Sequence, residues 1–254
     1  MLEIDEISLL ATVDTDVAVA DLEEQLSREG FTLNYYAWPD NRALLAEALS
    51  RRLPNLYGPA FGGIEDLALQ VKWAQGGGEV FSNVATPRSA AGPSFKKLAI
   101  GSSDWLGLPI LAVLRIFPRP AARQQIFAAF VREESLEQFL RGLHRSGLTL
   151  PLSAKIETAT AAEHFAGVGL FETVWGGASW GPEEEVEALL EEIESGILGK
   201  GGRLLELKES SDEEKIARLL HRSARSQLES RIEKSESRLP PAHRRLMARL
   251  KEGA

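Results

Sequence analysis

The sequence of 254 residues contains no cysteine. This absence excludes disulfides, thiolate nucleophiles, cysteine-ligated zinc and any iron–sulfur cluster held by this chain. A run of 18 apolar residues is also missing, as is a basic leader followed by an apolar stretch. We therefore expect no membrane span and no secretory signal, and we predict a cytoplasmic protein.

Positive charge is scarce, with 29 Lys and Arg against 37 Asp and Glu and a net charge of −8. This balance argues against a general nucleic-acid surface. The acidity is uneven, because residues from Lys208 onward carry +4 and residues 1–207 carry −12. We interpret the basic tail as a solvated helix surface, with docking to an acidic partner as the alternative.

Histidine is also rare, and the four residues are His144, His164, His221 and His243. None is spaced two or four residues from another, which is the pattern that metal sites on strands and helices need. The glycine clusters at 76–78 and 200–202 lack the spacing of a phosphate-binding loop and favour turns. The sequence therefore predicts no metal site and no catalytic residue.

The first half alternates short strands and helices. The patterns predict strands within 1–13, a helix over 17–26, a helix over 43–53, a strand over 62–71, a hairpin through 76–78 and a buried strand over 108–117. The residues at 35–38 (Tyr35, Tyr36, Trp38) favour a structural aromatic cluster.

The second half predicts strand 124–131, helix 135–147 capped by Ser135, strands 152–159 and 168–175, helix 182–198 and strand 203–208. Gly176 to Ser179 reads as a loop between two tryptophans. The order β-α-β-β-α-β is that of a ferredoxin-like module with both helices on one side of an antiparallel sheet. Charged helices over 211–237 and 242–251 follow. We expect an α+β protein with domains 1–120, 121–208 and 209–254.

One stretch, 78–120, carries a resemblance to a known family. Its loop Pro87 to Pro93 (PRSAAGP), its Gly101-Ser102 and Leu106-Gly107 pairs, and the strand LAVLRIFPRP are similar to the second lobe of the FAD-binding domain of the vanillyl-alcohol oxidase superfamily. Within that superfamily, the glycolate and D-lactate oxidoreductases and the alkyl-dihydroxyacetone-phosphate synthases are the most similar. The resemblance implies a partial FAD-binding (PCMH-type) domain at 1–120, a ferredoxin-like cap module at 121–208 and a helical tail.

The chain departs from that family at several cofactor contacts. The family pattern has aspartate, glutamate, glycine and threonine where this sequence has Ser94, Ser103, Asp104 and Trp105. A glycine-rich turn that approaches the flavin in the family falls on the predicted helix 43–53. We also expect this chain to lack the family's earlier pyrophosphate-binding loop and its later strands with paired histidines.

These departures imply that the chain alone binds no FAD and is not catalytic alone. If FAD is bound, the resemblance places its contacts at five positions: Ile64, Ala91, Gly92, Ser102 and Leu108.

Three functions stay open. The first is a degenerate FAD-linked-oxidase-like subunit that is a structural or regulatory partner of a catalytic FAD and iron–sulfur 2-hydroxy acid oxidoreductase. The second is a true flavoprotein subunit whose FAD site is completed by a partner chain. The third is a stand-alone binding protein that reuses the scaffold. We expect a protein partner or a homo-oligomer rather than a monomer.

Overall fold

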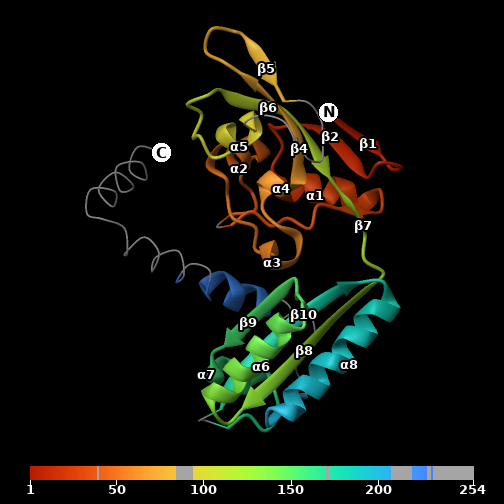
Figure 1. Ribbon diagram of the computed structural model, residues 1–254, viewed down its shortest axis with the longest axis vertical. Coiled ribbons are helices and arrows are strands. Elements are labelled where there is room, and N and C mark those ends of the chain that lie inside the picture. The colour runs from red at the N-terminus through yellow and green to blue at the C-terminus, as the bar shows by residue number, and fades with distance from the viewer. Residues whose placement is uncertain (39, 84–93, 170–171, 207–218, 228–229, 231–254) are drawn as a thin grey trace, which may run out of the picture.

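Two antiparallel sheets form the framework of the protein. The computed structural model describes residues 1–38, 40–83, 94–169, 172–206, 219–227 and 230. In the view of Figure 1 one sheet lies above the other, and the chain crosses between them once it has passed β7 (Phe117–Pro118). Of the predicted helix 211–237, the described part 219–227 is helical, and the predicted helix 242–251 lies outside the described residues. The domain division at 120 and 208 stays a prediction.

The first sheet has five strands, all antiparallel to their neighbours. In spatial order they are β1 (Leu2–Asp5), β2 (Leu10–Asp14), β6 (Leu108–Arg115), β4 (Ala68–Ala74) and β5 (Val80–Ser82). β7 pairs separately with β3 (Phe31–Thr32). The strand predicted over 108–117 is present as β6, but the expectation that it is buried is wrong for its first residues, because Leu108 and Ile110 are exposed. One face of this sheet is therefore only partly covered.

The covered face packs on helices α1 (Val19–Arg28), α2 (Leu45–Arg51) and α5 (Phe95–Ala99). The helix predicted over 17–26 becomes α1, and the one predicted over 43–53 becomes α2. Alternate residues of the strands meet apolar residues three or four apart on the helices, the pattern of an amphipathic helix on a sheet. The fully buried side chains of this core include Val19, Leu22, Leu26, Leu45, Leu49, Val71, Trp73, Ala112 and Leu114.

The strand predicted over 62–71 starts too early. Two helical turns, α3 (Gly58–Phe61) and α4 (Ile64–Leu67), precede β4. The carboxylate of Asp66 accepts a hydrogen bond from the backbone N–H of Gly63 at 3.0 Å, which caps the turn. The capping carboxylate of Asp66 therefore stabilises one helical turn before the chain extends into β4.

The second sheet has four strands, in the order β11 (Gly202–Leu204), β8 (Ala122–Phe130), β10 (Thr173–Gly181) and β9 (Leu152–Ile156). Helices α6 (Glu133–Arg145) and α8 (Glu183–Gly199) both cover one of its faces. Arg203 pairs with Ala129 in this sheet. The ferredoxin-like order is confirmed, with one addition: helix α7 (Thr158–His164) lies between β9 and β10.

Several predicted boundaries in this half are wrong. The strand predicted over 168–175 is β10, which starts at Thr173 and runs to Gly181, and the strand predicted over 203–208 ends at Leu204. Helix α6 begins at Glu133, two residues before the predicted cap Ser135, and no side chain caps it. Acidic Glu133 and Glu134 stand in its first turn, where the helix dipole favours negative charge. The strand predicted over 152–159 ends at Ile156, because Thr158 begins α7.

The glycines Gly176 and Gly177 lie in the middle of strand β10, not in a loop as the sequence suggested. A Cβ on Gly176 would come within 2.7 Å of the Phe127 ring, and one on Gly177 within 2.7 Å of the Trp175 ring. Both faces of this strand are buried against large rings. Glycine is required here for space, not for a turn.

The helical segment 219–227 covers the second face of this sheet. Leu219, Leu220 and Ala224 join a core with Phe127, Leu152 and Val174. Because α6 and α8 cover the opposite face, five consecutive residues of β8 from Ile126 to Phe130 are buried. The apolar stripe that the sequence shows on the charged helix is thus used to cover a sheet within the same chain.

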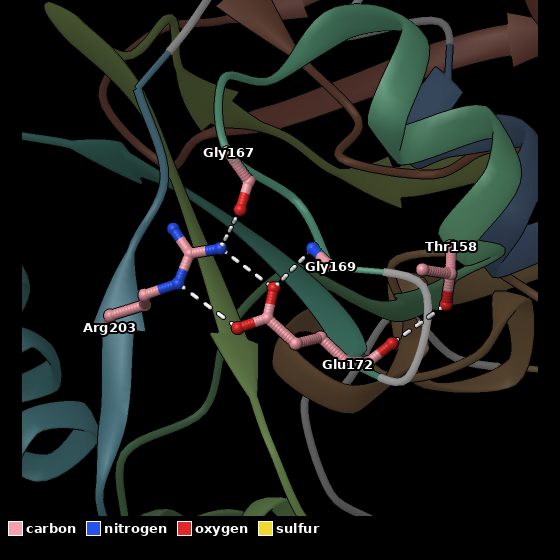
Figure 2. A network of polar contacts seen from close by, with 5 residues as sticks. All are labelled: Thr158, Gly167, Gly169, Glu172 and Arg203. Atoms are coloured by element: carbon pink, nitrogen blue, oxygen red, sulfur yellow. Dashed lines mark hydrogen bonds and ion pairs between the residues drawn. The ribbon is translucent and has the colours of Figure 1, made fainter.

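A clamp of polar contacts joins β11 to the chain just before β10 (Figure 2). The guanidinium of Arg203 donates from Nε to Oε1 of Glu172 at 3.1 Å and from Nη2 to Oε2 at 2.7 Å. The backbone N–H of Gly169 donates to the same carboxylate at 2.7 Å, and Thr158 donates to the backbone oxygen of Glu172. These bonds tie the edge strand to the loop that follows α7.

We expect Arg203→Met to lower the free energy of unfolding at pH 7 by about 1–2 kcal/mol, since a mostly buried carboxylate loses two charge-assisted hydrogen bonds. The hydrogen bonds from Arg203 hold the pKa of Glu172 below its usual value. A lowered folded pKa gives stability that is complete above the unfolded pKa of about 4.3 and is lost as pH falls through the folded value.

The difference between Arg203→Met and the wild type should therefore shrink in urea melts at acidic pH. Arg141→Met is the control, because it breaks an exposed pair with Glu137 on α6 and should change stability by less than about 0.5 kcal/mol. A difference that stays constant as Glu172 becomes protonated would contradict this account.

No helix in the described ranges is both long and apolar enough to cross a bilayer.

Candidate functional site

The turn at residues 100–107 forms one rim of the first sheet, between α5 and β6. Its backbone is anchored on the end of α2: Gly101 N–H donates to the Leu49 carbonyl at 2.9 Å, and Ser103 N–H donates to the Ser50 carbonyl at 2.8 Å. Ser103 and Asp104 both adopt the left-handed conformation, with φ of 50° and 68°. Two successive non-glycine residues in this conformation require strong support, which these bonds to α2 supply.

A cluster of charges lies beside this turn. Arg52, the residue that ends α2, forms an ion pair with Glu65 of α4. Lys96 of α5 donates to the Glu65 carbonyl at 3.1 Å and to the Ala68 carbonyl. A Cβ on Gly101 would lie 3.2 Å from the Cβ of Arg52, so the turn and this cluster are in contact.

The electrostatics of the cluster favour fixed charges. Burial lowers the pKa of Lys96, whose ammonium caps the carbonyls at the end of α4. Burial alone would raise the pKa of Glu65, but the hydrogen bond and the charge of Arg52 outweigh it and lower that pKa. The carboxylate and guanidinium therefore stay charged, and they link α2 to α4 behind the turn.

Large apolar side chains are exposed around the same rim. Trp105 at the tip of the turn is 87% exposed, Leu98 is 63% exposed and Leu108 is 56% exposed. Val80 is 57% exposed and lies in the same cross-strand row as Leu108, because each of them pairs with Ala74. We call Val80, Leu98, Trp105 and Leu108 the apolar rim. Exposed apolar residues gathered in one place are characteristic of contact surfaces.

The predicted cofactor contacts fall in different settings. Ser102 is half-buried in the turn, and Leu108 is exposed at the start of β6. Ile64 is fully buried at the start of α4. The structure therefore places Ile64 in the buried core, Ser102 in the turn and Leu108 on the exposed surface of β6, and whether they contact a cofactor stays a prediction. Ala91 and Gly92 lie outside the described residues.

A second group of side chains, made of aromatic and polar residues, connects the two sheets. Trp180 of β10 donates from Nε1 to Oδ1 of Asn34 at 3.0 Å and meets the ring of Tyr57 at 5.0 Å. His221 lies 4.4 Å from the ring of Tyr36. Burial lowers the pKa of His221 to about 4, so this histidine is neutral at physiological pH.

The sequence did not predict most of the contacts in the charge cluster or in the group that connects the two sheets. Arg52 and Glu65 are 13 residues apart, and Asn34 and Trp180 are 146 apart. No local spacing signals such pairs. The aromatic cluster at Tyr35 and Tyr36 was expected to be structural, and Tyr35 fits this, since its hydroxyl donates to the Leu53 carbonyl from the core. Among the described residues no three His, Asp or Glu side chains are placed to hold a metal ion.

Comparison with known proteins shows which proteins the chain is similar to. No family model matches the sequence. A stretch of 131 residues is 27% identical to the alkyldihydroxyacetonephosphate synthase of Caenorhabditis elegans, and it covers 52% of this chain and 22% of that protein. The chain is a relative of the FAD-linked oxidases of the vanillyl-alcohol oxidase superfamily.

Solved structures share this fold. Alkyldihydroxyacetonephosphate synthase in crystal form P212121 matches with a TM-score of 0.70 and 16% identity, over 82% of this chain and 41% of that one. The P1 form matches with a TM-score of 0.69, also at 16% identity, over 81% and 42%. The chain thus spans about a fifth of the curated relative and about two-fifths of the solved ones. The α+β fold is that of an FAD-linked oxidase.

The relationship to the FAD-linked oxidases accounts for the left-handed backbone of Asp104. Asp104 stands where the FAD-linked oxidase pattern has glycine, and it keeps the left-handed backbone with φ of 68°. Aspartate tolerates that conformation better than most residues. The backbone path of the turn is therefore compatible with the family pattern, while Trp105 presents an exposed ring where that pattern has threonine.

Proposed function

We propose that the chain is a degenerate FAD-linked-oxidase-like subunit without catalysis of its own. Its role is to be a structural or regulatory partner of a catalytic FAD and iron–sulfur oxidoreductase that acts on 2-hydroxy acids, in the cytoplasm. The relationship to the FAD-linked oxidases supplies the scaffold. The choice of a partner role rests on the chemistry of the rim.

The exposed Trp105 is the observation that carries this proposal. A flavin-binding turn needs small side chains and free backbone N–H groups near the phosphates and ring. Here the turn carries an indole at its tip, and two of its N–H groups, on Gly101 and Ser103, already donate to α2. A large exposed aromatic on a turn between exposed Leu98 and Leu108 in the sequence fits the centre of a protein interface better than a cofactor cradle.

A second function is favoured by the preserved backbone of the turn. Asp104 stands where the family pattern has glycine and has a left-handed backbone, which glycine adopts readily, and this supports a flavin-binding role for the turn. In this alternative the chain is a flavoprotein subunit, and a partner chain completes the FAD site. The contact candidates are then Ile64, Ala91, Gly92, Ser102 and Leu108.

The proposal is tested by assembly. We expect the tagged full-length chain, co-expressed with the FAD-linked and iron–sulfur oxidoreductase subunits of its own genome, to co-purify with them at a fixed ratio. Light scattering on the purified material gives the mass of the complex, and the chain expressed by itself shows whether it also forms homo-oligomers. A stable monomer in both preparations would contradict the proposal and favour a stand-alone binding protein.

A further inference from the structure

A polar pocket lies where the two sheets meet, away from the rim described above. It has a volume of about 450 Å³, which lies in the range of small-molecule sites. One wall comes from the first sheet and its loops and includes Asn34, Tyr36 and Tyr57. The other comes from the connection into the second sheet and includes Arg119 and Arg123. Neither the proposed interface nor the predicted cofactor contacts use this pocket.

The charges of the pocket favour an anion. Arg119 and Arg123 form no ion pair with any described residue. Glu23 also lines the pocket, but its two oxygens already accept hydrogen bonds from the Thr32 hydroxyl and from the Leu33 N–H. Two guanidinium groups against one carboxylate leave a surplus of one positive charge. A singly charged ligand balances that surplus, whereas a doubly charged one would face Glu23 with an excess of negative charge.

Neutral donors accompany the arginines. The hydroxyls of Tyr36 and Tyr57 form no hydrogen bond within the described ranges, and both rings line the pocket. Burial raises the pKa of Tyr57 to about 12, so its hydroxyl keeps its proton and can donate at neutral pH. Asn34 has its oxygen occupied by Trp180, which leaves its NH₂ group as a further donor.

The pocket is held in shape by contacts across the two sheets. The guanidinium carbon of Arg123 lies 4.9 Å from the centre of the Trp180 ring, a cation–π contact. Trp180 is in turn fixed by Asn34 and by the edge of Tyr57. Arg123 therefore stands in a set position relative to the tyrosine hydroxyls before any ligand arrives. Such preorganisation lowers the entropic cost of binding.

We propose that this pocket binds a small organic monocarboxylate. Arg119 and Arg123 pair with the carboxylate, because a planar guanidinium matches its two oxygens. The hydroxyls of Tyr36 and Tyr57 and the amide of Asn34 donate to the polar groups of the ligand, while the tyrosine rings cover its apolar body. Inorganic phosphate offers similar oxygens, but at neutral pH much of it is the dianion, which the surplus of one does not balance.

Calorimetric titration of the full-length chain tests this site with three probes: D-lactate, 4-hydroxybenzoate and inorganic phosphate. We expect saturable binding of at least one of the two carboxylates, tighter than that of phosphate. Arg119→Ala and Arg123→Ala should each weaken it by about tenfold, the usual effect of losing one charge-assisted hydrogen-bond partner. Tyr57→Phe should weaken it by about threefold, as expected for one neutral hydrogen bond.

Arg145→Ala is the matched control, because Arg145 is also an exposed arginine but lies at the end of α6, outside the pocket. Circular dichroism melts of every variant check that the fold is intact, and Arg123→Lys, which keeps the charge, should bind better than Arg123→Ala. Three results would each overturn the proposal: no saturable binding of either carboxylate, binding unchanged by both arginine variants, or phosphate binding tighter than both carboxylates.

Discussion

Replacing Trp105 by alanine is expected to weaken the association of the chain with its oxidoreductase partner at least thirtyfold. Truncating a buried interface tryptophan typically costs 2 kcal/mol or more, which is about thirtyfold in the dissociation constant. Trp105 has the features of such an anchor, since it is a large aromatic that is 87% exposed in the chain alone, and Leu98 and Leu108, before and after it in the sequence, are exposed as well. It also stands on a turn that α2 holds rigidly.

Ile7→Ala is the control for Trp105→Ala. Ile7 is 97% exposed but lies between β1 and β2, away from the apolar rim. Sedimentation velocity or calorimetric titration against the co-expressed oxidoreductase subunits measures both variants. Equal affinity of Trp105→Ala and the wild type would show that the apolar rim is not the interface.

Gly177→Val is expected to lower the free energy of unfolding by about 3 kcal/mol. This value is the upper part of the usual range for overpacking a core. Even the first carbon of a side chain at this position would lie 2.7 Å from the Trp175 ring and 2.8 Å from Leu150. These groups belong to a core packed on α6 and α8, so they have little room to move.

Gly142→Ala is the matching substitution at a glycine that has free space around it. Gly142 lies inside α6, and nothing is within 4 Å of a Cβ added there. Alanine should therefore stabilise the helix by about 0.5–1 kcal/mol through its higher helix propensity. Urea melts of both variants decide the matter. If the two substitutions had similar effects, space around Gly177 would not be the reason for its glycine.

Periodic segments of the chain could be predicted from the sequence, and segments shaped by distant neighbours could not. The helices α1, α2 and α8 carry apolar residues at helical spacing, and their positions are predictable from that pattern alone. The ferredoxin-like order follows from the alternation of such segments. Gly176 and Gly177 misled the prediction, because glycine usually signals a turn, whereas here the rings of Phe127 and Trp175 demand it.

The sites show the same division. The Gly101-Ser102 and Leu106-Gly107 pairs carried the family resemblance, and the turn at 100–107 contains both of them. The ion pair of Arg52 with Glu65 and the contact of Trp180 with Asn34 exist because the fold brings separate elements together. Helix α7 was missed because its alanine-rich sequence is short and lacks a strong apolar face. Residue pairs of this kind carry no signal in a single sequence.

The flavin content of the purified chain tests the central claim most directly. The full-length chain is purified alone and also in complex with its oxidoreductase subunits, and the visible absorbance spectrum of each preparation is compared with its protein concentration. The account predicts that the chain alone is colourless and carries no FAD, while the complex carries only the flavin of its catalytic subunit. One FAD per chain in the preparation purified alone would contradict the account and make this protein a flavoprotein in its own right.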